Sequence, residues 1–204
     1  MATVVLDRGL AEQLREERAA ARSDRWDEVW EGTYMMVPLP NIEHQDFVIR
    51  LAAIFRDTLG WDSDDIVLPG ANVSDRQKDW EHNYRCPDVV VYRAGTHAKN
   101  CGTHWYGGPD LAVEVVSKDD RTRDKIPFYS KVGTRELLVI DRDPWNLELL
   151  RLSAKKLKSV GASSGKKGRV LQSRVLPLSF RLISGQRRPT IEVVRSTDGK
   201  TWKV

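Results

Sequence analysis

Two acidic side chains that lie in runs of β-branched residues are the residues of this chain best suited to chemistry. Asp88 follows a proline in the segment 86–92, and Glu114 lies among valines in the segment 111–117. Both segments are typical of buried strands, where an acid costs free energy unless a partner or a function compensates for it. Two buried acids on neighbouring strands therefore predict a metal site.

A second Pro-Asp pair makes Asp110 a competitor of Asp88 for this site. Asp110 and Glu114 share one strand, and four residues at about 3.3 Å each place them roughly 13 Å apart, too far to hold one ion comfortably. Asp88 belongs to the partner strand of a hairpin with a long loop, residues 93–109. In the right register its Cβ atom lies about 5 Å from that of Glu114. We therefore predict that Asp88 and Glu114 are the metal ligands.

The two acids also predict the kind of metal. Carboxylates, a main-chain carbonyl and water molecules suit a hard divalent cation such as Mg²⁺ or Mn²⁺. The two cysteines, Cys86 and Cys101, form no Cys/His cluster with the spacing of a structural zinc site. A hard cation lowers the pKa of a bound water and neutralises the charge that grows on a phosphate in the transition state.

A lysine near such a cation would complete the chemistry. The segment 121–132, followed by Gly133, predicts a helix after the Glu114 strand, and Lys125 and Tyr129 share one face of it because they are four residues apart. Lys125 could therefore reach the carboxylates, where an amine orients the water and stabilises the phosphate. The alternative is an ordinary surface lysine, with Tyr129 packed in the core.

Other elements must position these side chains. Asn41 is a good N-cap, and the apolar spacing after it predicts a helix that Gly60 ends, with His44 near the inward face of its first turn. His44 could equally be an ordinary surface histidine. Further patterns predict a solvated helix over 8–22, two short strands within 26–37, a strand at 66–68, and a strand at 136–141 whose hairpin partner is 147–152.

The last quarter of the chain has a different texture. The segment 154–169 combines six lysines and arginines with glycines and serines, which predicts a hairpin tip or a mobile loop. Asp198-Gly199 predicts the turn of a closing hairpin. We divide the chain into an N-terminal peripheral helix (1–24), a core (25–152), and a C-terminal basic loop and hairpin (153–204) that extends the same domain.

Composition limits the class of protein. A chain of 204 residues with 40% hydrophobic and 30% charged residues predicts a soluble globular domain with a substantial core. No apolar run approaches the roughly 18 residues that cross a bilayer, and the first residues lack a signal-peptide pattern, so we expect a cytoplasmic protein without a membrane partner. The net charge of +4 permits a polyanionic partner without requiring one.

The order of these motifs resembles the Uma2-type restriction endonucleases, a bacterial branch of the Pro-Asp, Asp/Glu-x-Lys nuclease superfamily. The matching pieces are Glu28 four residues before Gly32, His44 at the start of a helix, Pro87-Asp88, Pro109-Asp110-Leu111 leading to Glu114-Val115-Val116-Ser117, Lys125 with Tyr129, and the segment 133–141. They cover over half the chain.

The resemblance implies a fold and an activity. The fold would be α/β (α+β), restriction-endonuclease-like, with a mixed central β-sheet flanked by helices and extra β-hairpins. The activity would be magnesium-dependent cleavage of DNA, with Glu28 and His44 lining the pocket of Asp88, Glu114 and Lys125. It also allows a homodimer through the N-terminal helix or the C-terminal hairpin.

The sequence departs from the superfamily pattern at one functional position. The lysine that usually follows the acid by two residues is Val116 here, and Lys125 on the next helix offers the replacement. The segment before Lys125 is about three residues shorter than in the family, so the family's aspartate falls on Arg121, with Asp120 or Asp124 as substitutes.

Two other function classes stay open. One is a catalytically inactive nucleic-acid-binding or assembly module that keeps the nuclease fold, which the valine at position 116 favours. The other is a metal-dependent hydrolase of small phosphorylated substrates. Turnover with magnesium or manganese separates the first from a nuclease, and inhibition by competing DNA separates the second.

Overall fold

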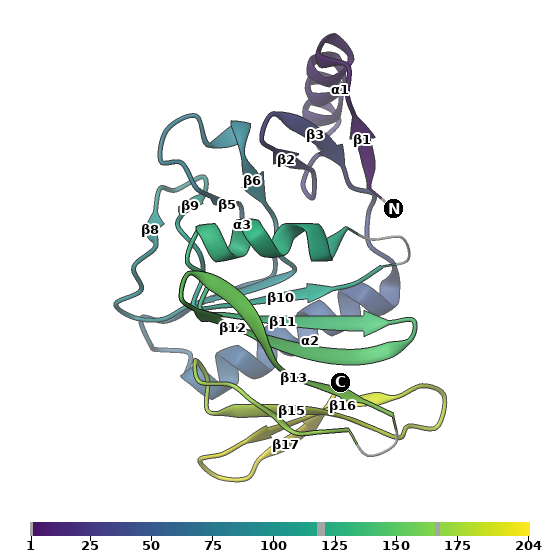
Figure 1. The fold of residues 1–204 in the computed structure, drawn as a ribbon, viewed down its shortest axis with the longest axis vertical. Helices are drawn as coiled ribbons and strands as arrows, with labels where there is room; N and C mark the ends of the chain where they lie inside the picture. The colour runs from purple at the N-terminus through teal and green to yellow at the C-terminus, as the bar shows by residue number, and fades with distance from the viewer. Residues whose placement is uncertain (1, 118–120, 166–167) are drawn as a thin grey trace.

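The computed structural model describes residues 2–117, 121–165 and 168–204, which form three β-sheets and three α-helices (Figure 1). The central sheet has the strand order β13-β12-β11-β10-β7-β4. Its strands are β4 (Ile66–Leu68), β7 (Val89–Tyr92), β10 (Leu111–Val115), β11 (Glu136–Arg142), β12 (Trp145–Ser153) and β13 (Lys156–Ser164). β10 and β11 are parallel and the other neighbours are antiparallel, so the sheet is mixed.

Two smaller sheets extend the central one. The N-terminal sheet contains β1 (Thr3–Val5), β2 (Glu28–Trp30), β3 (Thr33–Met36), β5 (Val73–Ser74), β6 (Tyr84–Arg85), β8 (Lys99–Asn100) and β9 (Trp105–Tyr106). The C-terminal sheet contains β14 (Leu171–Gln172), β15 (Leu178–Ile183), β16 (Thr190–Arg195) and β17 (Thr201–Lys203). The helices are α1 (Arg8–Ala20), α2 (Ile42–Leu59) and α3 (Ile126–Lys131).

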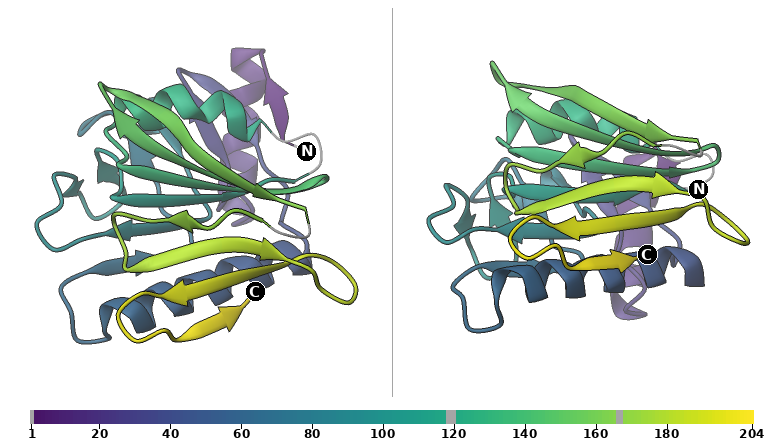
Figure 2. Two further views of the ribbon diagram at one scale, coloured as in Figure 1. Left: turned by 60° about the horizontal axis from the view of Figure 1, so that its bottom comes forward. Right: turned by 90° about the horizontal axis from the view of Figure 1, so that it is seen from below.

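The central sheet is covered on both faces. α2 contacts β4, β7 and β10, while the C-terminal sheet contacts β12 and β13. Both lie on the same side of the sheet in the rotated views of Figure 2, where Phe55 of α2 packs edge-on against Phe180 of β15 in one apolar core. α3 covers the opposite face through Phe128 and Tyr129. Residues on β7, β10 and β11 are therefore buried on both faces, which explains their continuous apolar runs.

Local signals place α2 as predicted. The side chain of Asn41 accepts a hydrogen bond from the backbone N–H of His44 (2.9 Å) and so caps the first turn. Gly60 ends the helix with φ of +88°, a conformation that costs glycine no side-chain clash. Inward-facing residues such as Phe47 and Leu51 are fully buried.

Three sequence predictions need correction. The connection from β7 to β10 is not a simple hairpin loop, because it contributes β8 and β9 to the N-terminal sheet. The predicted helix over 121–132 is a 3₁₀ turn, Thr122–Lys125, followed by α3 with Pro127 in its first turn. Most of the basic segment 154–169 is not a loop.

That basic segment forms strand β13, which pairs with β12 along its whole length. Its lysines face solvent on an edge strand, where charge discourages pairing with other chains, while Leu157 and Ser163 face inward. Lys166 and Lys167 lie outside the described residues. No helix in residues 2–117, 121–165 and 168–204 is long and apolar enough to cross a membrane.

Candidate active site

The register between β7 and β10 brings the two predicted acids together. Val89 pairs with Val113, and one further step of the same antiparallel register places Asp88 opposite Glu114. The backbone N–H of Asp88 donates to the carbonyl of Val113 (3.0 Å), which extends the pairing to this point. Directly opposed residues share a face of the sheet, so both carboxylates lie on the same side.

Asp88 is buried and held from two sides. Its Oδ1 atom lies 2.8 Å from Nε2 of His44, and its Oδ2 atom accepts a hydrogen bond from the backbone N–H of Val115 (2.7 Å). His44 belongs to the first turn of α2, and its Nδ1 atom has no hydrogen-bond partner among the described residues. The start of α2 thus fixes the orientation of a carboxylate at the start of β7.

Glu114 receives two side chains from the segment that follows β10. Nζ of Lys125 lies 3.2 Å from both carboxylate oxygens of Glu114, and the Tyr129 hydroxyl donates to Oε1. The predicted shared face of Lys125 and Tyr129 is therefore present, although Lys125 ends the 3₁₀ turn and Tyr129 lies on α3. Tyr129 is fully buried, so it packs in the core and contacts the acid at the same time.

Glu28 comes from a different sheet to the same lysine. Its Oε1 atom lies 2.9 Å from Nζ of Lys125 and accepts a hydrogen bond from the backbone N–H of Cys86 (2.8 Å). Its Oε2 atom accepts from Nε1 of Trp30 (2.6 Å). Lys125 therefore connects the carboxylate of β2 with that of β10.

Burial makes the local charge balance unusual. The pKa of Glu114 is raised from 4.5 to about 8, first by burial and then by the charges of Asp88 and Glu28, although Lys125 and the hydrogen bond from Tyr129 lower it. Burial and the charge of Glu114 likewise raise the pKa of Tyr129. The site thus concentrates more negative charge than its lysine offsets.

One pocket of about 310 Å³ unites the five residues. Its lining includes Glu28, His44, Asp88, Glu114 and Lys125. A larger neighbouring pocket of about 610 Å³ shares His44 and Asp88 with it. All five candidate site residues therefore lie around one hollow, although they come from β2, α2, β10, the 3₁₀ turn and the residue before β7.

The donor set suits a divalent cation that keeps several waters. No group of three or more His, Cys, Asp or Glu side chains that could hold a metal occurs in residues 2–117, 121–165 and 168–204. Asp88 and Glu114 nevertheless offer two buried carboxylates, and Mg²⁺ is commonly held by one or two carboxylates with the rest of its shell from water and substrate phosphate. The residues present therefore fit a hard cation and not structural zinc.

The competing acids are held elsewhere. Asp110 forms an ion pair with Arg135 (2.9 Å) and accepts a hydrogen bond from the backbone N–H of Arg93 (2.8 Å). Asp124 pairs with Arg121 (2.8 Å), and both of these side chains are about half exposed. Asp120 lies outside the described residues.

Two contributors escaped the sequence analysis. Trp30 follows Glu28 by two residues on β2, a spacing that places both side chains on one face, yet nothing local marks its indole as a partner of the acid. Arg142 lines the pocket from the end of β11 and donates from Nε to the carbonyl of Val116 (3.1 Å). Only the pairing of β11 beside β10 brings Arg142 next to the position of the usual lysine.

Comparisons with known proteins agree with this architecture. A family model described as "Uma2: Putative restriction endonuclease" matches residues 11–184. None of the curated proteins matches the chain. A solved structure described as "a putative nuclease belonging to DUF820 from Anabaena variabilis ATCC 29413" is similar, with a TM-score of 0.51 and 16% identity over 65% of this chain and 75% of that chain. At this identity the likeness shows the fold, and it confirms the predicted restriction-endonuclease-like class.

Proposed function

Because the chain belongs to the Uma2 family, we propose that it is a magnesium-dependent endonuclease that hydrolyses phosphodiester bonds of DNA. The observation that carries the proposal is the convergence of Asp88, Glu114 and Glu28 on one pocket with Lys125 among them. Two opposed carboxylates with a lysine alongside have the composition that metal-assisted phosphoryl transfer needs.

Asp88 and Glu114 would hold the Mg²⁺ or Mn²⁺ ion. When bound, the ion supplies a water of lowered pKa and offsets the charge that grows on the phosphate. Excess buried negative charge around Glu114 favours a cation there, because a metal replaces the proton that Glu114 otherwise retains. His44 keeps Asp88 oriented through its 2.8 Å contact, as a neighbour of a metal ligand commonly does.

Lys125 has the position to act on the water and on the phosphate. Its Nζ atom is held by Glu28 and Glu114 at the pocket wall, with a side chain that is 12% exposed. An ammonium group fixed there donates a hydrogen bond to a nucleophilic water or to a phosphate oxygen without reorganising during the reaction. Lys125 thus takes the part of the lysine missing at Val116.

The arginines of the pocket support a polyanionic substrate. Arg121 and Arg142 line the same pocket as the acids. Cations beside an acidic centre can contact phosphates on either side of the scissile bond. DNA as the substrate rests on this lining, on the family and on the net charge of +4.

The test is cleavage of supercoiled plasmid in Mg²⁺ or Mn²⁺ by the wild type, Asp88→Asn and Glu114→Gln. Both variants should lose metal-dependent nicking, while the control Asp198→Asn, which alters an exposed acid of the β16–β17 turn, should keep it. Unchanged cleavage by both site variants would remove the proposed mechanism. A wild type that binds DNA with salt-dependent affinity but never turns over would instead support the inactive binding module.

A further inference from the structure

Arg85 of β6 is a buried cation without a carboxylate partner in the described chain. Its side chain lies between two aromatic rings, with Cζ 4.5 Å from the ring centroid of Trp30 and 4.4 Å from that of Phe128. The residue is only 5% exposed. Cation–π contacts of this kind hold a guanidinium in place, but they do not satisfy its N–H groups.

The hydrogen bonds of Arg85 use one end of the guanidinium. Nη1 donates to the carbonyls of Val29 and Tyr84 and to Oδ1 of Asn83. Nε is buried and has no partner among residues 2–117, 121–165 and 168–204. A buried charged donor left unsatisfied is costly, so its presence calls for a ligand.

Arg85 lines a separate pocket of about 410 Å³, here called the Arg85 pocket. Its charged lining comprises Arg85, Arg121 and Lys131 against Glu31 and Asp124. Asp124 is already paired with Arg121, and Lys131 with Asp75 at 2.6 Å. The pocket therefore has a surplus of cationic groups around a guanidinium whose shape suits phosphate oxygens.

Trp30 and Arg121 separate the Arg85 pocket from the active-site pocket and line both. Nε1 of Trp30 donates to Glu28 in the active site, while the ring stacks on Arg85. The guanidinium of Arg121 also lies over the Trp30 ring, 5.0 Å from its centroid. One indole thus joins the carboxylate that holds Lys125 to the unsatisfied cation behind it.

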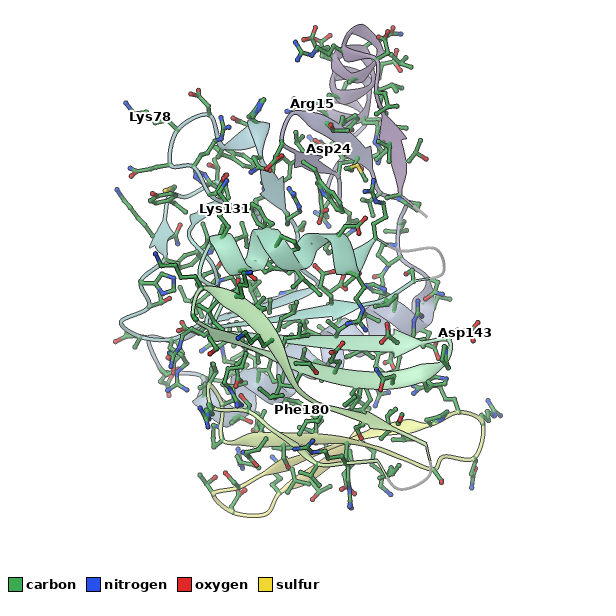
Figure 3. The ribbon with its side chains drawn as sticks, viewed as in Figure 1. Arg15, Asp24, Lys78, Lys131, Asp143 and Phe180 are labelled. Carbon is green, nitrogen blue, oxygen red and sulfur yellow. The ribbon has the colours of Figure 1, made fainter. Side chains whose placement is uncertain are left out.

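We propose that the Arg85 pocket binds a phosphate group of the nucleic-acid chain whose scissile phosphate lies in the active-site pocket. The inference rests on the proposed function, and it adds a phosphate-binding subsite to it. Arg85 grips the phosphate, Lys131 at the C-terminal end of α3 supplies a second cation from the rim (Figure 3), and Arg121 lies between the two phosphates.

The test measures binding of a short fluorescent DNA duplex in EDTA, where cleavage cannot occur, over a series of salt concentrations. Arg85→Gln should weaken binding roughly ten-fold and reduce the slope of log affinity against log salt by about one, as loss of one phosphate contact does. Lys131→Ala should act in the same direction. The matched control Lys200→Ala, which removes another aspartate-paired surface lysine, should change neither quantity.

Circular dichroism and thermal unfolding verify that each variant is folded, and Lys131→Ala carries the test if Arg85→Gln is not. Wild-type affinity and salt slope in the folded variants would overturn the subsite. Stabilisation of the wild type by inorganic phosphate, with no effect of either variant on DNA binding, would show a site for free phosphate and would overturn the nucleic-acid assignment.

The outcome is separable from the proposed function. Loss of nicking in Asp88→Asn together with unchanged DNA binding in the Arg85 and Lys131 variants contradicts the subsite alone. Weakened DNA binding in those two variants together with continued nicking by Asp88→Asn and Glu114→Gln contradicts the active-site assignment alone.

Discussion

The amine of Lys125 lies 3.2 Å from both carboxylate oxygens of Glu114, although the lysine occupies a 3₁₀ turn and the acid a central strand. The nuclease superfamily pattern puts this lysine on the strand itself, at the position of Val116 here. The chain therefore brings the same pair of groups together through a different element.

Replacing Lys125 tests whether this pair is catalytic. Lys125→Met keeps the length of the side chain and removes its charge, so we expect metal-dependent nicking to fall roughly 10²–10³-fold, the size of effect seen when one donor to a developing anion is lost. Plasmid nicking rates at saturating Mg²⁺ measure it. Lys200→Ala serves as the control, and wild-type nicking by a folded Lys125→Met would show that Lys125 is a structural ion-pair partner only.

Replacing His44 tests whether a residue behind a metal ligand tunes the ion. In His44→Ala, Asp88 keeps its hydrogen bond from Val115 but loses the contact with Nε2, so we expect Mg²⁺ to be bound roughly 10–100-fold more weakly. The Mg²⁺ concentration that gives half-maximal nicking measures this effect. His82→Ala, at an exposed histidine, should leave it unchanged; an equal shift in both variants would speak against a role for His44.

The pKa of Glu114 predicts how the metal-free protein responds to pH. The folded protein keeps a proton on Glu114 up to about pH 8, whereas the unfolded chain releases it near the ordinary value of 4.5. Since the folded state binds more protons in this window, the free energy of unfolding should fall as pH rises through it and level off above it. Glu114→Gln cannot titrate, so its stability should fall less steeply.

Urea unfolding in EDTA at several pH values measures this difference. Parallel pH dependences of the wild type and Glu114→Gln would show that Glu114 has the same pKa in the folded and unfolded states. The comparison is made without metal because a bound ion displaces the proton.

Glu136 predicts that the C-terminal segment unfolds with the core. This buried acid of β11 accepts hydrogen bonds from Nε of Arg151 (2.8 Å), the Ser173 hydroxyl (2.6 Å) and the backbone N–H of Arg174 (3.0 Å). Glu136→Ala leaves Arg151 without its buried partner, so we expect a loss of about 3–5 kcal/mol in the free energy of unfolding.

Chemical denaturation should show one transition for the wild type, at lower denaturant in Glu136→Ala. Two separate transitions would instead mean that residues 153–204 form an independent unit. Nicking by folded Glu136→Ala should equal that of the wild type, because Glu136 is not among the residues that line the active-site pocket.

Local signals in the sequence were sufficient for several elements. Asn41 and Gly60 delimit α2, Asp198-Gly199 forms the turn between β16 and β17, and Glu31-Gly32 joins β2 to β3. Each depends on capping or turn chemistry that neighbouring residues supply. The basic segment around β13 was misread because lysines and glycines resemble a loop, and pairing with β12 overrode that local preference.

The sequence by itself determined the acids. Asp88 and Glu114 stand out because a carboxylate in a β-branched run is costly wherever the run is buried, and the two-residue period of strands separates Asp88 from Asp110 as the partner of Glu114. Tertiary structure alone decided what surrounds them. Glu28 reaches Lys125 from another sheet, and Arg85 meets Trp30 and Phe128 across sheet and helix, because packing and not local preference sets contacts between residues distant in sequence.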